Sequence, residues 1–158
     1  MTLITGNEDC FNYSRKMKNK LRTYLPYIAW SQAVAATLGS LYFSEIAKFP
    51  PCVLCWYQRI VMYPLVWIIA VGIIKKDKNM PLYVLPFSLS GMAIAFYHVL
   101  LYHNIIPEAA APCIQGVSCT TKFIQFFGFV TIPFLSFLGF AIISLSMVVY
   151  LRLREKTK

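Results

Sequence analysis

Four of the five cysteines in this 158-residue chain form two closely spaced pairs. Cys52 and Cys55 make a Cys-x-x-Cys motif, and Cys113 and Cys119 make a second pair with wider spacing. In a Cys-x-x-Cys motif the thiol pKa is lowered, and the resulting thiolate is the nucleophile of thiol–disulfide exchange. The two pairs therefore predict redox chemistry. Cys10 is left over and is interpreted as a cytosolic thiol without a role.

The first pair lies where an apolar helix should begin. Pro50-Pro51 stops the preceding segment, and proline suits the first turn of a helix. Cys52 and Cys55 then share one face, and the free N–H groups and dipole of the first turn stabilise a thiolate. Arg59 follows Cys55 by one turn. Its charge could hold a thiolate or an anionic reduced cofactor, or could extend to lipid headgroups. We favour the first interpretation because charges inside a span are costly.

The second pair lies in the long connection that follows the third apolar block, at 103–122. Gly116 between Cys113 and Cys119 permits a tight turn, so a local disulfide is feasible. This disulfide could be a static brace, but so small a ring would stabilise the protein little, and we favour an exchange site. Zinc bound by the two pairs is the other alternative. No metal site is predicted, because the spacing does not give two Cys-x-x-Cys motifs.

The elements that position these residues are four apolar blocks. The chain is 58% hydrophobic, and its 13% of charged residues is about half of what soluble domains carry. Blocks of this length can cross a bilayer, and only helices satisfy their backbone hydrogen bonds there. The sequence predicts an all-α integral membrane protein, a bundle of four transmembrane helices, rather than a soluble protein with buried helices. The blocks are Leu25–Phe43, Val53–Ile74, Leu82–Tyr102 and Phe123–Leu151.

Basic residues indicate the orientation, because they are retained on the cytoplasmic side. Five precede the first block, three lie between the second and third, and four follow the last: Arg15, Lys16, Lys18, Lys20, Arg22, Lys75, Lys76, Lys78, Arg152, Arg154, Lys156 and Lys158. Both termini are therefore expected in the cytoplasm, and both cysteine pairs outside. The net charge of +9 is attributed to topology and contact with anionic lipid. Nucleic-acid binding is not expected.

The predicted organisation is a single membrane domain with short tails. A basic cytoplasmic tail occupies 1–24, the membrane redox domain 25–151, and a second cytoplasmic tail 152–158. Helices are expected at about 25–44, 52–74, 82–102 and 129–151, with outer loops at 45–51 and 103–128. The first helix is interpreted as retained, because the apolar block is longer than the core of a cleaved signal peptide.

Four stretches of the sequence resemble the disulfide bond formation protein B (DsbB) family, and most closely its BdbC-like branch from Gram-positive bacteria. They are Gly-Ser-Leu-Tyr-Phe-Ser-Glu-Ile (39–46), Pro-Cys-Val-Leu-Cys-Trp-Tyr-Gln-Arg (51–59), Cys-Ile-Gln-Gly-Val-Ser-Cys (113–119) and Phe-Gly-Phe-Val-Thr-Ile-Pro (127–133). The likeness covers about residues 25–150. It implies a multi-pass protein of the bacterial plasma membrane.

The resemblance also implies a function and roles for the cysteines. Electrons would pass from an extracytoplasmic thioredoxin-like thiol oxidase, similar to DsbA or BdbD, to a membrane quinone, either menaquinone or ubiquinone. Cys113 matches the cysteine that forms a mixed disulfide with the partner, and Cys119 resolves it. Cys52 would exchange with this pair. Cys55 would face the quinone with Arg59 beside it.

A histidine completes the site that the resemblance implies. Tyr97-His98 matches a position that the family places at the quinone pocket, although His98 could also be a packed histidine within the bundle. The chain departs from proteobacterial members, whose loop cysteines are far apart, so the route between the two pairs could differ. The competing function is a non-enzymatic membrane assembly protein with two structural disulfides. It predicts no reactivity with quinone.

Overall fold

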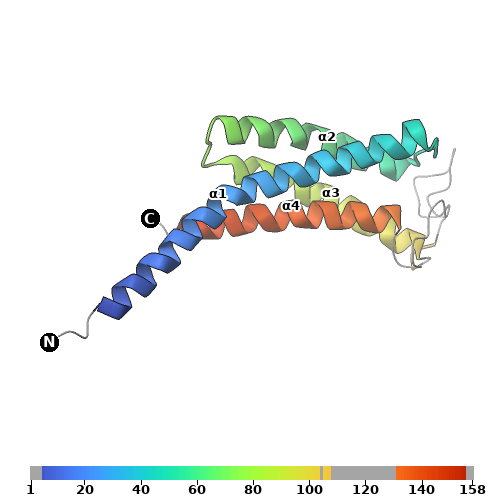
Figure 1. Cartoon of the computed structure of the whole chain (residues 1–158). Helices are drawn as coiled ribbons and strands as arrows, with labels where there is room; N and C mark the ends of the chain where they lie inside the picture. Colours follow the sequence, from blue (N-terminus) through green and yellow to red (C-terminus); the bar gives the residue numbers. More distant parts are fainter. Residues whose placement is uncertain (1–4, 104, 108–130, 156–158) are drawn as a thin grey trace.

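The computed structural model describes residues 5–103, 105–107 and 131–155. Every regular element in these ranges is helical. Cys113, Cys119 and most of the predicted outer loop at 103–128 lie outside the described residues. The elements are α1 (Thr5–Leu41), the π-helical turn η1 (Tyr42–Ile46), α2 (Val53–Ile74), α3 (Met80–Tyr102) and α4 (Ile132–Glu155), arranged as in Figure 1.

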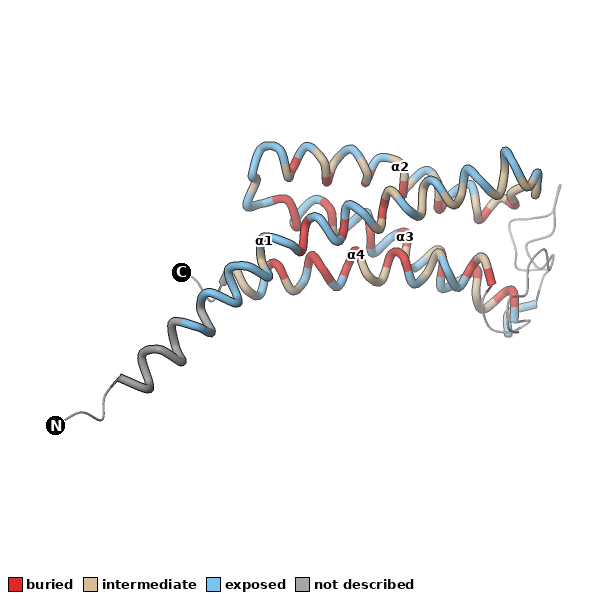
Figure 2. Tube along the Cα trace, viewed as in Figure 1, coloured by how far each residue is buried: buried red, intermediate tan, exposed pale blue. Residues whose placement is uncertain are grey.

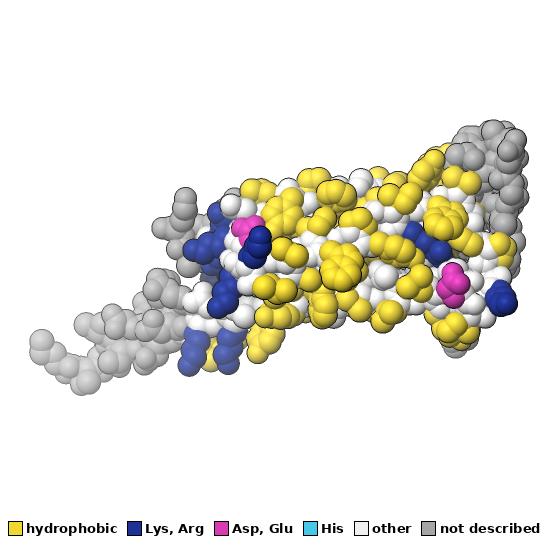
Figure 3. All heavy atoms as spheres, turned by 90° about the horizontal axis from the view of Figure 1, so that it is seen from above, with side chains coloured by type: hydrophobic (Ala, Val, Ile, Leu, Met, Phe, Trp, Pro, Cys, Tyr) yellow, Lys and Arg dark blue, Asp and Glu magenta, His cyan; other side chains and the backbone are white. Residues whose placement is uncertain are grey.

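Three of the described helices are long and apolar enough to cross a membrane. They are α2, α3 and most of α4, with mean hydropathies of 1.6, 1.7 and 2.3. Large apolar side chains cover their outer surface, where Trp67 and Ile74 are 74% and 79% exposed. Figure 3 shows this apolar band along the molecule. An apolar surface of this extent requires lipid around it. The apolar half of α1 is less hydropathic because it contains polar residues such as Gln32 and Thr37.

The helices pack as a bundle in which α1 lies beside α2 and α4, and α3 also lies beside α2 and α4. Positions coloured as buried occur along all four helices, on the faces turned toward the other helices (Figure 2). Ala29 and Ala33 are fully buried on α1, and small residues of this kind let helix backbones approach closely. Leu65 on α2 and Phe140 on α4 fill the space between the helices.

Basic side chains gather at the end of the bundle where α1 enters and α4 leaves (Figure 3). Arg154 Nη1 donates to the backbone oxygen of Lys78 at 2.7 Å and to the side-chain oxygen of Asn79 at 3.0 Å. The Arg22 guanidinium carbon lies 5.4 Å from the centre of the Tyr150 ring. These contacts tie the α2–α3 turn to α4, and α1 to α4. The start of α2 and the end of α3 lie at the opposite end (Figure 1).

The first helix differs most from its predicted bounds. It begins at Thr5 rather than near residue 25, and the π-helical turn extends it to Ile46, inside the expected loop at 45–51. Hydropathy marks where a helix enters lipid and not where the helix begins. No proline precedes Pro26 in α1, so none interrupts the helix between Thr5 and that residue. The other helices start or end within a few residues of their predicted bounds. The division into tails and membrane domain remains a prediction.

Gly91 on α3 permits a close contact with α4. A β-carbon there would collide with the Phe140 ring on α4, which is itself fully buried. We expect Gly91→Ala to lower the free energy of unfolding by about 1–3 kcal/mol, the usual cost of overpacking. Gly39→Ala is the matched control, because a β-carbon at Gly39 meets nothing within 4 Å. Unfolding in a denaturing detergent series measures both, and equal stabilities would contradict the packing described here.

Candidate functional site

The Cys52–Cys55 pair is built on the first turn of α2. Cys52 is the N-cap residue, with φ −73° and ψ 170°, and its sulfur accepts a hydrogen bond from the Cys55 backbone N–H at 3.4 Å. Both cysteines are free thiols, and their sulfur atoms lie 3.1 Å apart. An extended N-cap followed by a helical turn places the two side chains on one face, as predicted from their spacing.

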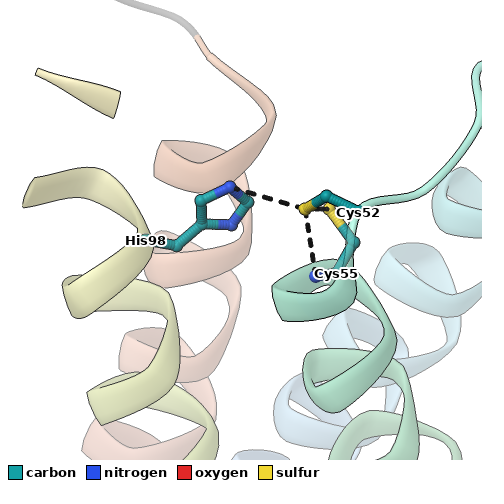
Figure 4. Close-up of side chains that lie close together, drawn as sticks. All are labelled: Cys52, Cys55 and His98. Carbon is teal, nitrogen blue, oxygen red and sulfur yellow. Dashed lines mark hydrogen bonds between the residues drawn. The ribbon is translucent and has the colours of Figure 1, made fainter. Parts of the chain in front are cut away.

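His98 reaches the pair from α3 (Figure 4). Its Nε2 lies 3.8 Å from the Cys52 sulfur, and its Nδ1 lies 3.2 Å from the side-chain nitrogen of Gln58 on α2. With the Gln58 amide as donor, Nδ1 accepts and the ring proton sits on Nε2, facing the sulfur. His98 and Gln58 are both buried. Gln58 therefore orients the imidazole toward Cys52.

These contacts favour the thiolate at Cys52, which directly precedes the apolar span of α2. The hydrogen bond from the Cys55 thiol lowers the pKa of Cys52 well below its ordinary value. Burial of Cys52 raises the pKa, and the contact with His98 lowers it further. Hydrogen bonds to the charged form outweigh its desolvation here. Cys52 is therefore the nucleophilic sulfur of the pair, and Cys55 is its hydrogen-bond donor.

Arg59 turns toward α1. Its Nη2 donates to the backbone oxygen of Ser40 at 3.0 Å, and its guanidinium carbon lies 5.5 Å from the centre of the Trp56 ring. Carbonyl groups near the C-terminal end of a helix carry the negative end of its dipole, which favours a cation there. This partly buried bond holds the guanidinium between two helices. Arg59 is thus bonded to α1, and its role toward a thiolate or a reduced cofactor stays a prediction.

A cavity of about 340 Å³ connects these groups. This volume lies within the range of small-molecule sites. Its wall on α1 includes the small residues Ala35, Ala36 and Gly39, beside Gln32 and Ser40. The polar end of the cavity contains Cys52, Cys55, Gln58, Arg59 and His98, and the remaining lining is largely apolar and aromatic, including Phe43, Met62, Tyr63 and Phe140.

The structure brings together four of the six residues predicted for the site: Cys52, Cys55, Arg59 and His98. Cys113 and Cys119 lie outside the described residues, and their roles stay predictions. The sequence assigned no role to Gln58. A buried amide inside an apolar span, one turn beyond Cys55, is a signal that could have identified it.

Removing the imidazole tests its effect on Cys52. Because a hydrogen bond to the thiolate stabilises the charged form, we expect His98→Phe to raise the pKa of Cys52. Less thiolate is then present at a given pH, so the pH profile of alkylation moves to higher pH. Iodoacetamide rates measure this profile in a chain whose other cysteines, apart from Cys55, are serine. His103→Phe is the matched control, since His103 is the exposed C-cap of α3. Identical profiles for all three proteins would contradict the assignment.

Comparison with known proteins places this site among proteins of disulfide formation. Residues 22–150 match the family described as Disulfide bond formation protein DsbB. A probable disulfide formation protein C from Halalkalibacterium halodurans is 50% identical over 124 residues, covering 78% of this chain and 90% of that protein. The disulfide bond formation protein C of Bacillus subtilis is 46% identical over 133 residues, covering 83% and 94%. No solved structure gives a significant match.

Proposed function

Because the chain belongs to the DsbB family of disulfide bond formation proteins, and so acts in thiol–disulfide oxidation in a membrane, we propose that it transfers electrons to a quinone. In this proposal the electrons come from an extracytoplasmic thioredoxin-like thiol oxidase. Reoxidation of that oxidase would support disulfide formation in secreted proteins. The match over residues 22–150 confirms the family resemblance inferred from the four stretches of sequence between residues 39 and 133.

The cavity carries this proposal, because it joins the cysteine pair to a mainly apolar space of ligand size. Its residues fit a quinone. Arg59 and His98 provide polar groups beside the sulfurs, and the apolar walls suit a lipid-soluble ring. The Tyr63 hydroxyl lines the cavity and is buried with no hydrogen-bond partner among the described residues. A buried hydroxyl without a partner is costly, and a carbonyl oxygen would satisfy it.

The residues would divide the chemistry between them. The Cys52–Cys55 pair would start as a disulfide, which an incoming thiolate attacks, forming a mixed disulfide and releasing the other sulfur of the pair as a thiolate. The second thiol of the incoming dithiol then breaks the mixed disulfide, so the incoming dithiol leaves as a disulfide and the Cys52/Cys55 pair is left as a dithiol. The dithiol then loses two electrons and two protons as its own disulfide forms. A bound quinone supplies the matching reduction to quinol. Arg59 would stabilise negative charge at the polar end of the cavity, and His98 would hold the proton nearest Cys52.

We further propose that the apolar half of α1, from Leu25 to Leu41, is the fourth span, with both chain ends in the cytoplasm. Its packing against α2 and α4 gives it the same depth as the three apolar helices. The basic end of the bundle then faces the cytoplasm. The Cys52 end faces outward, where a secreted thiol oxidase can reach it. Labelling of single added cysteines from either side of intact cells tests this orientation.

Quinol formation by the purified protein, driven by a reduced thioredoxin-like partner, is the direct test. We expect stoichiometric quinol with partner disulfide. Cys10→Ser serves as the control, because Cys10 lies near the start of α1, whereas the α1 residues that line the cavity begin at Gln32. A protein that forms no quinol under these conditions would instead be the non-enzymatic assembly protein with structural disulfides.

The second cysteine pair allows the partner to be trapped. We expect Cys119→Ser to accumulate a covalent complex between Cys113 and the partner, because exchange proceeds through a mixed disulfide and the resolving sulfur is missing. Non-reducing electrophoresis followed by mass spectrometry identifies the linked cysteines. Cys113→Ser is the matched variant and should give no complex. Trapping by Cys113→Ser alone would reverse the two roles.

A further inference from the structure

We infer that Cys52 and Cys55 in their reduced form, together with His98, bind a thiophilic divalent cation such as Zn²⁺. The bound ion blocks oxidation of the cysteine pair. The inference concerns the chain's own ligands. It does not depend on the quinone proposal, because the ion would compete with any oxidant of these two sulfurs.

The donor atoms already lie at nearly the separations that tetrahedral zinc requires. The three ligand atoms all fall within 4.8 Å of one another. The two sulfurs are 3.1 Å apart, and the Cys52 sulfur is 3.8 Å from His98 Nε2. With Zn–S near 2.3 Å and Zn–N near 2.0–2.1 Å, tetrahedral ligands stand roughly 3.5–3.8 Å apart. Changes of no more than about 1.3 Å in these separations therefore complete the geometry.

The position of each ligand suits the role. A Cys-x-x-Cys pair on a helical turn is a common zinc-ligand spacing, and the third ligand comes from a different helix. Metal-bound histidines usually have their second ring nitrogen held by another group. Gln58 lies 3.2 Å from His98 Nδ1. Rotation of its amide presents the oxygen to an Nδ1 proton, which leaves the Nε2 lone pair for the metal.

Binding of Zn²⁺ by the two cysteine sulfurs gives a site without net charge. Zn²⁺ binds the Cys52 thiolate and displaces the proton of the Cys55 thiol, which passes to solvent, and no electron is transferred. Two thiolates then neutralise the ion, which lowers the cost of placing it beside an apolar cavity. Among the described residues that line the cavity, Arg59 is the cation, and its charge opposes the ion. Three protein ligands leave a fourth position open toward the cavity for water.

Redox state controls the site. Once Cys52 and Cys55 form a disulfide, neither sulfur is a thiolate, and two of the three ligands are lost. Only the reduced protein binds the ion. Bound Zn²⁺ in turn holds both sulfurs, so they cannot attack or form a disulfide until it leaves. The site makes the enzyme sensitive to thiophilic metals in its surroundings.

Cobalt is the probe for the test, because tetrahedral Co²⁺–thiolate sites absorb visible light. The full chain carries Cys10→Ser, Cys113→Ser and Cys119→Ser, so that the only remaining thiols are those of the proposed site. We expect one Co²⁺ per reduced chain, with charge-transfer and tetrahedral bands, displaced by one equivalent of Zn²⁺. The disulfide form should show no such bands.

Histidine variants distinguish a three-ligand site from metal binding by the two cysteine sulfurs alone. We expect His98→Phe to weaken Co²⁺ binding at least about tenfold and to alter the spectrum, because one of three ligands is lost. His103→Phe is the matched control, since the chain has two histidines and His103 is exposed. Gln58→Leu, which retains all ligands, should weaken binding less than His98→Phe. Equal affinity in His98→Phe and the parent, or equal binding by the disulfide form, would overturn the inference. Circular dichroism confirms that each variant is folded.

Discussion

Cys52→Ser and Cys55→Ser should each abolish turnover with the partner and leave the helical fold intact. The two sulfurs lie 3.1 Å apart, and neither a dithiol nor a disulfide can form when one is an oxygen. Loss of a catalytic nucleophile costs on the order of 10⁴–10⁶ in rate in other enzymes. We expect a loss of at least about a thousandfold here. The measurement is steady-state oxidation of the reduced partner by the purified protein.

The two serine variants should differ in their remaining thiol. Cys55→Ser keeps the Cys52 sulfur next to His98, so Cys52 should still react readily with an alkylating reagent. Cys52→Ser leaves the Cys55 thiol, which does not occupy the N-cap of α2. Cys10→Ser is the control for substitution of a cysteine as such, and it should have the parent rate. Parental turnover in either Cys52→Ser or Cys55→Ser would exclude the relay.

Arg59→Ala should raise the apparent KM for quinone about 10- to 100-fold while changing partner oxidation little. Arg59 lies one turn beyond Cys55 and lines the cavity, so it is farther from the outer end where the partner is proposed to dock. Hydrogen bonds to charged groups contribute about 1.5–3 kcal/mol, which sets this range. Arg59→Lys should restore only part of the loss, because an ammonium group lacks the planar fork that spans Ser40 and a ligand.

Two assays distinguish binding of quinone from exchange with the partner. Quinone reduction at varied quinone reports the first, and a single-turnover measurement of partner oxidation reports the second. Arg152→Ala is the matched control, because Arg152 is an exposed arginine in the last turn of α4, at the opposite end of the bundle. Unchanged dependence on quinone in Arg59→Ala would assign the residue a structural role through its bond to Ser40.

Much of the bundle follows from local sequence. Apolar blocks and Pro51 are sufficient to place α2, because helix formation in lipid depends on local backbone hydrogen bonds. The same reasoning misplaced the start of α1 at residue 25. A basic polar segment can continue a helix outside the membrane, and hydropathy contains no information about where that helix begins. The π-helical turn at Tyr42–Ile46 was not anticipated either, since no simple residue pattern marks it.

The site was predictable where one helix supplies it and less so where two helices meet. Helical periodicity alone puts Cys52, Cys55 and Arg59 on one side of α2. The pairing of Gln58 with His98 joins residues 40 positions apart, and it depends on how α2 packs against α3. The direction of Arg59 toward α1 depends likewise on tertiary packing. Family resemblance suggested His98, but no spacing in the sequence could have given its distance to Cys52.

The small residues on the α1 wall of the cavity have a consequence for how this protein could change over time. Ala35, Ala36 and Gly39 leave room because they lack bulk, and none of them is a sulfur, a base or a cation. Substitution by a larger residue would narrow the chamber without altering the reactive pair. Under the proposed function, the size of the oxidant admitted and the chemistry performed are therefore encoded at separate positions. Relatives could diverge in the oxidant they accept through single steps on this wall while retaining the same sulfurs.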